Sequence, residues 1–165
     1  MASRSVASPV LKLPPFQELI DAHGRDVHRF LRSLVGQDAD DCYQETWIAA
    51  LRAYPRLRDD SNLRGWILTV AHRKAIDRIR ARRREAVPLA ELPEPASRAD
   101  AVNVVDEELW EAVRLLPDKQ RTAVALRYVV DAAYTEVAGV MGTSEEAARR
   151  SVHEGLKRLR TEYAR

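Results

Sequence analysis

The chain has 165 residues, of which 45% are apolar and 32% are charged, and its formal net charge is +2. This apolar share supports packed cores and excludes an intrinsically disordered protein, while the length suits one ordinary domain or two very small ones. Because acidic and basic residues nearly balance, any nucleic-acid site has to be a local basic patch.

Residue types that carry catalysis are sparse. Cys42 is the only cysteine, which excludes a disulfide and a thiolate metal cluster. The four histidines lack metal-ligand spacing and no glycine-rich phosphate loop occurs, so we expect no enzymatic activity, no metal and no cofactor.

No apolar run reaches membrane length, and residues 1–14 lack a signal-peptide core. We therefore expect a cytoplasmic protein with no membrane insertion and a disordered tail over residues 1–14.

Apolar residues recur at helical spacing along most of the chain, which predicts an all-α fold. Three helices are expected in the first half, over residues 16–34, 43–54 and 63–84, with the polar loop RLRDDSN before the third. Prolines precede the first helix, Gly36 follows it, and Pro55 stops the second.

The segment 85–104 contains three prolines and no helical stripe, so we expect a linker there. Helical periodicity returns at residue 105, which predicts two small helical domains over residues 15–84 and 105–165. The charge changes sign at this boundary, from +6 over residues 64–85 to −6 over residues 86–118. Either the two segments attract each other, or they face different partners, one polyanionic and one basic.

The stretch YTEVAGVMGTSEEAARRSVHEGLKRL has the layout of a helix-turn-helix. Gly142 suits a tight turn, and Thr143 or Ser144 suits the N-cap of the second helix. Charged side chains are left on the outer face of that helix, where a DNA-reading helix carries its contacts. They are Glu145, Arg149, Arg150, His153 and Lys157. The alternative is the solvated outer face of a helical hairpin.

Two stretches of the first half also carry charge patterns. Asp38, Asp40 and Asp41 lie where acids favour a helix N-terminus, and with the residues that follow they form either a simple cap or a docking face for a basic helix. The stretch LRGWILTVAHRKAIDRIRARRR follows the polar loop and could hold single-stranded DNA. The alternative is a solvated basic helix end with Trp66 in the core.

Taken together, these stretches resemble the extracytoplasmic-function (ECF, group 4) sigma factors of the sigma-70 family. DADDCYQETW is similar to the family's region 2.1/2.2, LRGWILTVAHRKAIDRIRARRR to regions 2.3 and 2.4, and the chain from LPDKQ to KRLR to region 4. The resemblance covers about residues 15–161. It implies a sigma region 2-like helical bundle, an acidic linker and a region 4-like helix-turn-helix.

The resemblance also implies a function, which is promoter-specific transcription initiation with core RNA polymerase. The residues it assigns to the β′ clamp helices of the polymerase are Asp40, Asp41, Gln44, Glu45 and Trp47. Those assigned to melting and capture of the −10 element are Arg58, Asp59, Asp60, Ser61, Asn62, Arg64, Arg73, Lys74, Asp77, Arg78 and Arg80. Those assigned to the −35 duplex are Thr143, Ser144, Glu145, Arg149, Arg150, His153 and Lys157. Region 4 is expected on the β flap, the linker near the RNA exit path, and an anti-sigma factor or other regulator as a further partner.

The sequence departs from the family pattern at several positions of the DNA-reading segments. Arg73 stands where asparagine is common, Ala147 where threonine is usual, and Ser151 where arginine is usual. Gly155 is unfavourable inside a helix, by about 1 kcal/mol relative to alanine. The base preference therefore does not follow from the resemblance.

Two other functions would each explain part of the sequence. A DNA-binding regulator that uses the helix-turn-helix alone would need a sensor or dimer interface in residues 15–84, where the sequence shows no ligand pocket or heptad pattern. A helical adaptor without a DNA role leaves the arginine-rich stretches at 82–84 and 149–160 unexplained.

Overall fold

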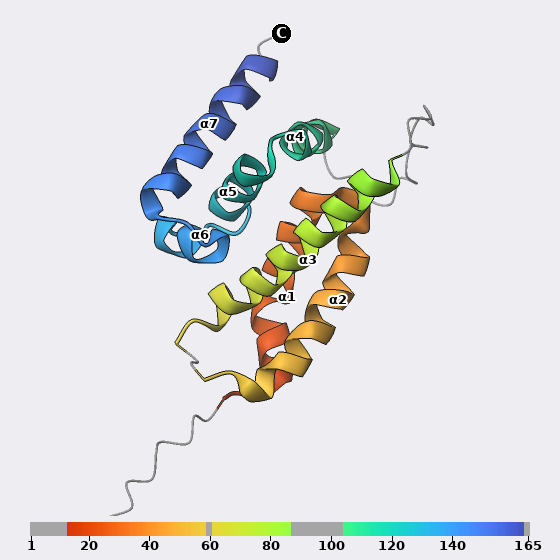
Figure 1. Cartoon of the computed structure of the whole chain (residues 1–165), viewed down its shortest axis with the longest axis vertical. Coiled ribbons are helices and arrows are strands. Elements are labelled where there is room, and N and C mark those ends of the chain that lie inside the picture. The colour runs from red at the N-terminus through yellow and green to blue at the C-terminus, as the bar shows by residue number, and fades with distance from the viewer. Residues whose placement is uncertain (1–12, 59–60, 87–103, 164–165) are drawn as a thin grey trace, which may run out of the picture.

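The computed structural model describes residues 13–58, 61–86 and 104–163, and every regular element in these parts is helical (Figure 1). The α-helices are α1 (Phe16–Val35), α2 (Ala39–Ala53), α3 (Leu63–Glu85), α4 (Val104–Arg114), α5 (Asp118–Tyr128), α6 (Tyr134–Met141) and α7 (Glu145–Tyr163). Two 3-10 turns, η1 (Gly36–Asp38) and η2 (Tyr54–Arg56), flank α2. The all-α prediction is confirmed.

The first domain is a bundle of α1, α2 and α3 around an apolar core. Phe30 and Leu31 of α1 and Ile67 and Leu68 of α3 are fully buried at its centre. The predicted helices are present, but α2 starts four residues before the predicted apolar stripe because two aspartates occupy its first turn. Trp66 is partly buried beside the core rather than fully enclosed in it.

The second domain contains α4 to α7, and its last two helices form the predicted helix-turn-helix. Gly142 takes the left-handed conformation, with φ 65° and ψ 36°, which ends α6 and turns the chain. Of the two predicted caps, Ser144 is the one used, because its Oγ accepts a hydrogen bond of 3.1 Å from the Ala147 amide. The structure thus confirms the turn and the start of α7.

Gly155 has a packing role that its helix propensity does not suggest. A Cβ atom there would lie 2.8 Å from Cγ2 of Val124 and 3.4 Å from Cβ of Gln120 on α5. The glycine lets α7 approach α5 closely, and this approach fixes the direction in which α7 leaves the domain.

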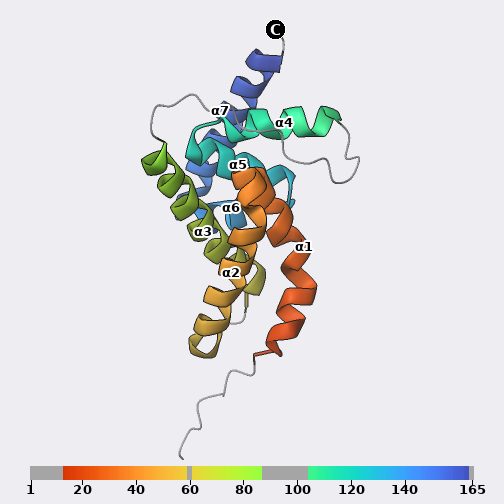
Figure 2. The same cartoon turned by 90° about the vertical axis from the view of Figure 1, so that its right-hand side faces the viewer.

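The two domains pack against each other, with α6 against α3 and with α4 and α5 against α1 (Figures 1 and 2). One continuous cluster of buried residues includes Phe30 and Ile67 from the first domain and Leu126 and Val137 from the second. The two domains therefore share a core.

Among the described helices, none is both long and apolar enough to cross a membrane. Residues 1–12 of the predicted N-terminal tail and most of the predicted linker lie outside the described residues. The last two tail residues are not disordered as predicted, because Leu13 packs against the core and the Pro14 carbonyl accepts a hydrogen bond from the Tyr54 hydroxyl.

Candidate nucleic-acid interface

Helix α7 presents the predicted charged face to solvent. Glu145, Arg149, Arg150, His153 and Lys157 are all exposed, while Ala148, Val152 and Leu159 face the core. The helix is bound to α5 and α6 and leans away from the first domain (Figure 1). Thr143 is half-buried in the turn, and Ser144 is engaged as the N-cap. The outer face is exposed to solvent, and its two arginines form ion pairs within the helix, Arg149 with Glu145 at 4.0 Å and Arg150 with Glu146 at 3.7 Å.

Tyr134, the first residue of α6, supports this face in a way that the sequence did not reveal. The guanidinium carbon of Arg149 lies 4.2 Å from the centre of its ring, and that of Arg127 lies 5.0 Å from it. Such contacts attract a cation to the aromatic face. Tyr134 therefore holds Arg149 in position, and only its location at the start of the first helix of the helix-turn-helix gave a hint of this role.

A second basic surface lies on α3. Arg73, Asp77 and Arg80 are exposed and Lys74 is half-buried. Arg78 differs, because its guanidinium is held by the carboxylate of Asp38. Burial alone would raise the pKa of Asp38, but hydrogen bonds and charge from Arg82 and Arg78 outweigh it and hold that pKa below its usual value. Arg78 is thus a structural cation as the chain stands.

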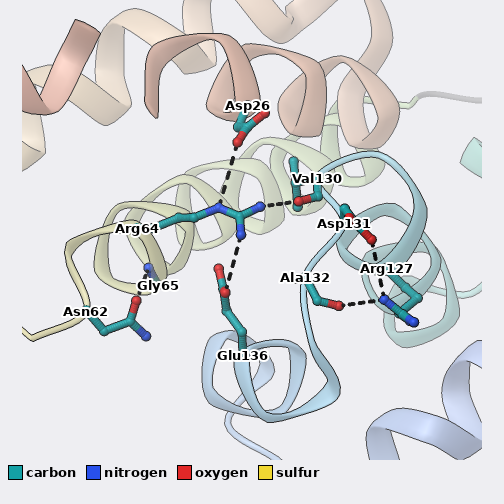
Figure 3. A network of polar contacts seen from close by, with 9 residues as sticks. All are labelled: Asp26, Asn62, Arg64, Gly65, Arg127, Val130, Asp131, Ala132 and Glu136. Carbon is teal, nitrogen blue, oxygen red and sulfur yellow. Dashed lines mark hydrogen bonds and ion pairs between the residues drawn. The ribbon is translucent and has the colours of Figure 1, made fainter. Parts of the chain in front are cut away.

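Arg64, at the start of α3, is engaged by the second domain (Figure 3). Its guanidinium donates to the carbonyl oxygen of Val130 and lies 3.5 Å from Oε2 of Glu136 on α6. On its other side, Nε lies 3.7 Å from Oδ2 of Asp26 on α1. We call these four residues the Arg64 clasp. The residue that sequence analysis assigned to DNA is here part of the interface between the domains.

The loop before α3 is described only in part. Arg58 and Ser61 are exposed, whereas Asp59 and Asp60 lie outside the described residues. Asn62 is the N-cap of α3, and its Oδ1 accepts a hydrogen bond of 2.9 Å from the Gly65 amide. This contact occupies the side-chain oxygen of a residue that the resemblance assigned to the −10 element.

Helix α2 carries an acidic face. Asp40, Asp41, Gln44 and Glu45 are exposed, and Asp40 lies 2.8 Å from Nε2 of His28. Beside them is a cavity of about 160 Å³, lined by Asp41, Cys42, Gln44, Glu45, Ile48 and Arg78. Burial, followed by the nearby charge of Glu45, raises the pKa of the Cys42 thiol to about 11, so this cysteine is not a nucleophile.

Trp47 does not belong to an exposed contact surface, and the expectation that it does is corrected. Its side chain is only 8% exposed and packs edge-on against the rings of Phe16 and Tyr43. Large aromatic rings gain most by such burial. The exposed apolar residues on α2 are instead Ile48 and Leu51, which sequence analysis missed although they follow Gln44 at helical spacing.

The fold and these surfaces define a two-domain helical protein with one exposed, charged C-terminal helix and a second basic helix. Family comparisons match the same two parts, with the Sigma-70 region 2 model over residues 19–85 and the Sigma-70 region 4 model over residues 106–159. Within the described residues, no group of three or more histidine, cysteine, aspartate or glutamate side chains is placed to hold a metal ion.

Individual relatives agree with these matches. The chain is 32% identical over 164 residues to the ECF RNA polymerase sigma factor SigD of Mycobacterium tuberculosis, covering 88% of this chain and 76% of the relative. It is 27% identical to the RNA polymerase sigma factor CarQ of Myxococcus xanthus, with 88% and 87% covered. The chain belongs to the ECF sigma factors of the sigma-70 family. It is therefore a promoter-specificity factor of transcription and not an enzyme.

Solved structures share the fold. The sigma factor RpoE of Bartonella quintana, in complex with the anti-sigma factor NepR, superposes with a TM-score of 0.73 at 20% identity, covering 88% of this chain and 94% of that one. CnrH in complex with the cytosolic domain of CnrY gives 0.68 at 23% identity, with 90% and 87% covered.

Proposed function

We propose that this sigma factor binds core RNA polymerase and reads a promoter at two places, with α7 on the −35 duplex and α3 on the melted −10 element. The observation that carries the proposal is the exposed face of α7, where Arg149, Arg150 and Lys157 project from a capped helix behind a tight turn. Arginine at the start of such a helix can bind guanine edges or phosphates in the major groove.

The −10 part of the proposal rests on α3. Arg73, Lys74 and Arg80 form a basic track that suits the backbone of a single strand. Asp77 lies beside this track, and the exposed residues Arg58 and Ser61 lie before it. Arg64 and Arg78 would join the track only after their present carboxylate partners release them.

Promoter engagement requires the two domains to separate. The −10 and −35 elements lie about 25 base pairs apart, which is roughly 85 Å of duplex at about 3.4 Å per base pair. The domains described above are packed on each other through a shared core. The 17 residues between Ala86 and Val104 can reach at most about 60 Å, which together with the domains themselves is enough for the span.

For polymerase binding we propose the acidic face of α2, made of Asp40, Asp41, Gln44 and Glu45, together with exposed Ile48. Acidic and apolar groups side by side suit a partner helix that is basic and partly apolar. The double change Asp41→Arg and Glu45→Arg should weaken binding to core polymerase while lowering the melting temperature only slightly, because a charge in the first turn of α2 is worth about 0.3–1 kcal/mol. If the double variant binds core polymerase with the parental affinity, this face of α2 is not part of the polymerase interface.

We propose further that the second domain rests on the β flap, that the chain acts in the cytoplasm with the polymerase, and that a regulator such as an anti-sigma factor controls it. The last point draws on RpoE and CnrH, which were solved with NepR and with CnrY. A regulator that binds the packed form would keep the two DNA-reading helices too close together for a promoter.

Run-off transcription tests the function directly. Purified core polymerase is supplied with the promoter of the protein's own gene, with and without the protein. A discrete transcript that depends on the protein is expected. If no transcript forms on any template, while the protein alone binds duplex DNA tightly, the chain acts as a polymerase-independent regulator and the proposal fails.

A further inference from the structure

A groove between the two domains is lined by five arginines. Leu34, Val35, Asp38, Arg78, Ile79, Arg82, Arg83, Arg114 and Arg121 surround a space of about 240 Å³. Both domains contribute, because α1, η1 and α3 supply one side and α4 and α5 supply Arg114 and Arg121 on the other. The groove therefore exists in this form only while the domains are packed together.

The charges of the groove are only partly compensated. Its lining holds five guanidinium groups and one carboxylate, that of Asp38. Two carboxylates outside the lining pair with its arginines. Asp118 accepts hydrogen bonds of 3.0 and 2.7 Å from Arg83, and Glu107 accepts one of 3.0 Å from Arg114. Two positive charges remain in excess after every pair is counted.

Arg121 is the most buried of these cations. Its side chain is 9% exposed, and its two terminal nitrogens donate to the carbonyl oxygens of Leu34 and Leu116, at 3.3 and 3.2 Å. Its Nε is buried and has no hydrogen-bond partner. Burial, reinforced by the nearby charges of Arg83 and Arg114, lowers the pKa of Arg121 despite Asp118 at 3.9 Å. A buried donor with no acceptor costs free energy that an anion would recover.

We propose that this groove binds a small polyvalent anion of the phosphate class, namely a diphosphate group. Planar guanidinium groups bind phosphate oxygens in pairs, which makes an arginine cluster a typical phosphate site. The apolar residues Leu34, Val35 and Ile79 form part of the wall, and a wall of low polarity strengthens each charged hydrogen bond. A cavity of about 240 Å³ is smaller than the roughly 300 Å³ at which sites for drug-sized ligands begin, so it suits a diphosphate and not an entire nucleotide.

Such an anion would lock the packed form. It would join Arg82 and Arg83 of the first domain to Arg114 and Arg121 of the second, and a ligand that binds one conformation shifts the population toward it. This consequence rests on the proposed function, because it supposes that the packed form must open at a promoter. The binding of the anion does not rest on the proposed function, and it is measured on the free chain without polymerase.

The experiment titrates sodium pyrophosphate into the full-length chain by calorimetry, with sodium chloride matched to equal ionic strength as the blank. Saturable binding of one anion per chain is expected. Arg83→Gln should weaken it about tenfold or more, because a hydrogen bond to a charged group is a strong one. Arg84→Gln is the matched control, since it removes an equal charge from the next residue of α3, which does not line the groove.

Asp118→Asn separates anion binding from loss of the interdomain ion pair. It breaks the same contact as Arg83→Gln but leaves the arginine in the groove, so pyrophosphate should bind at least as tightly as to the parent. A parallel titration with adenosine diphosphate identifies the source of the group, because tighter binding than pyrophosphate indicates a nucleotide and weaker binding indicates the inorganic anion.

Three results would overturn the proposal. The first is no saturable binding of either compound beyond the chloride blank. The second is equal weakening by Arg83→Gln and Arg84→Gln, which would mark general charge attraction. The third is a loss in Asp118→Asn as large as in Arg83→Gln, which would assign the effect to the ion pair. Slower amide exchange of α3 and α5 with pyrophosphate is expected for the lock, and unchanged exchange would refute it.

Discussion

The Arg64 clasp gives the sharpest prediction about opening. In Glu136→Gln the side chain keeps its shape but loses its charge, while Asp26 and the Val130 carbonyl remain as partners of Arg64. The Arg64 and Glu136 side chains are 29% and 18% exposed, and their nearest atoms are 3.5 Å apart, the outer limit of a hydrogen bond. We therefore assign the loss of this charge about 1 kcal/mol, below the usual range for charged hydrogen bonds. The packed form should become about fivefold less favoured over the open form.

The assay is fluorescence anisotropy of a single-stranded −10 oligonucleotide with the free protein at one fixed salt concentration. If binding needs the open form, its apparent affinity rises with the open fraction, up to about fivefold when that fraction is small. Glu146→Gln is the control, because it removes the same charge from an ion pair of 3.7 Å that lies within α7 and is exposed. Equal gains in both variants would mean simple charge attraction. No gain in Glu136→Gln, together with unchanged amide exchange across α3 and α6, would refute the reasoning.

Three further predictions concern other parts of the chain. Replacing Arg149 or Arg150 by alanine should cost about 1–3 kcal/mol at one −35 position if that arginine reads a base, whereas a phosphate contact would weaken all sequences alike, and footprints on promoter variants distinguish these results. Gly155→Ala should lower the melting temperature although alanine favours a helix, because its Cβ would meet Val124 at 2.8 Å and overpacking costs about 1–3 kcal/mol. A parental or higher melting temperature would contradict the close approach of α7. Burial, assisted by the charge of Arg73, lowers the pKa of His72 below its usual 6.5. The neutral imidazole therefore contributes its full stabilisation of the folded state at neutral pH, and this contribution declines as pH falls from about 6.5 through the lowered pKa. His72→Gln should flatten that part of the unfolding profile, and an unchanged slope would contradict it.

The spacing of apolar residues and the positions of proline and glycine predicted the helices well, because these signals depend only on residues close together in the sequence. The apolar stripe of α1, the turn at Gly142 and the outer face of α7 each follow from a few neighbouring residues. The resemblance to sigma factors then assigned both domains, and the family matches confirm it.

What the sequence did not reveal depends on contacts between distant residues. The resemblance to sigma factors assigned Arg64 and Arg78 to DNA, but in the fold Glu136 and Asp38 compensate their charges from 72 and 40 residues away. The resemblance likewise assigned Trp47 to the polymerase interface, whereas the fold buries its ring against Phe16. The charge pattern of a sequence shows which residues are charged, but it does not show which charged groups lie close together in the fold.

The ring of Tyr134 beneath Arg149 has a consequence for how promoter preference can change. A long side chain that is already ordered loses less conformational entropy when it binds, a saving of about 0.5–1.5 kcal/mol for each such side chain. If α7 reads the −35 duplex as proposed, part of its binding energy is then set on α6, by a residue 15 positions earlier whose ring contacts Arg149. Substitution at position 134 could therefore alter which promoters are used while every DNA-contacting residue stays the same.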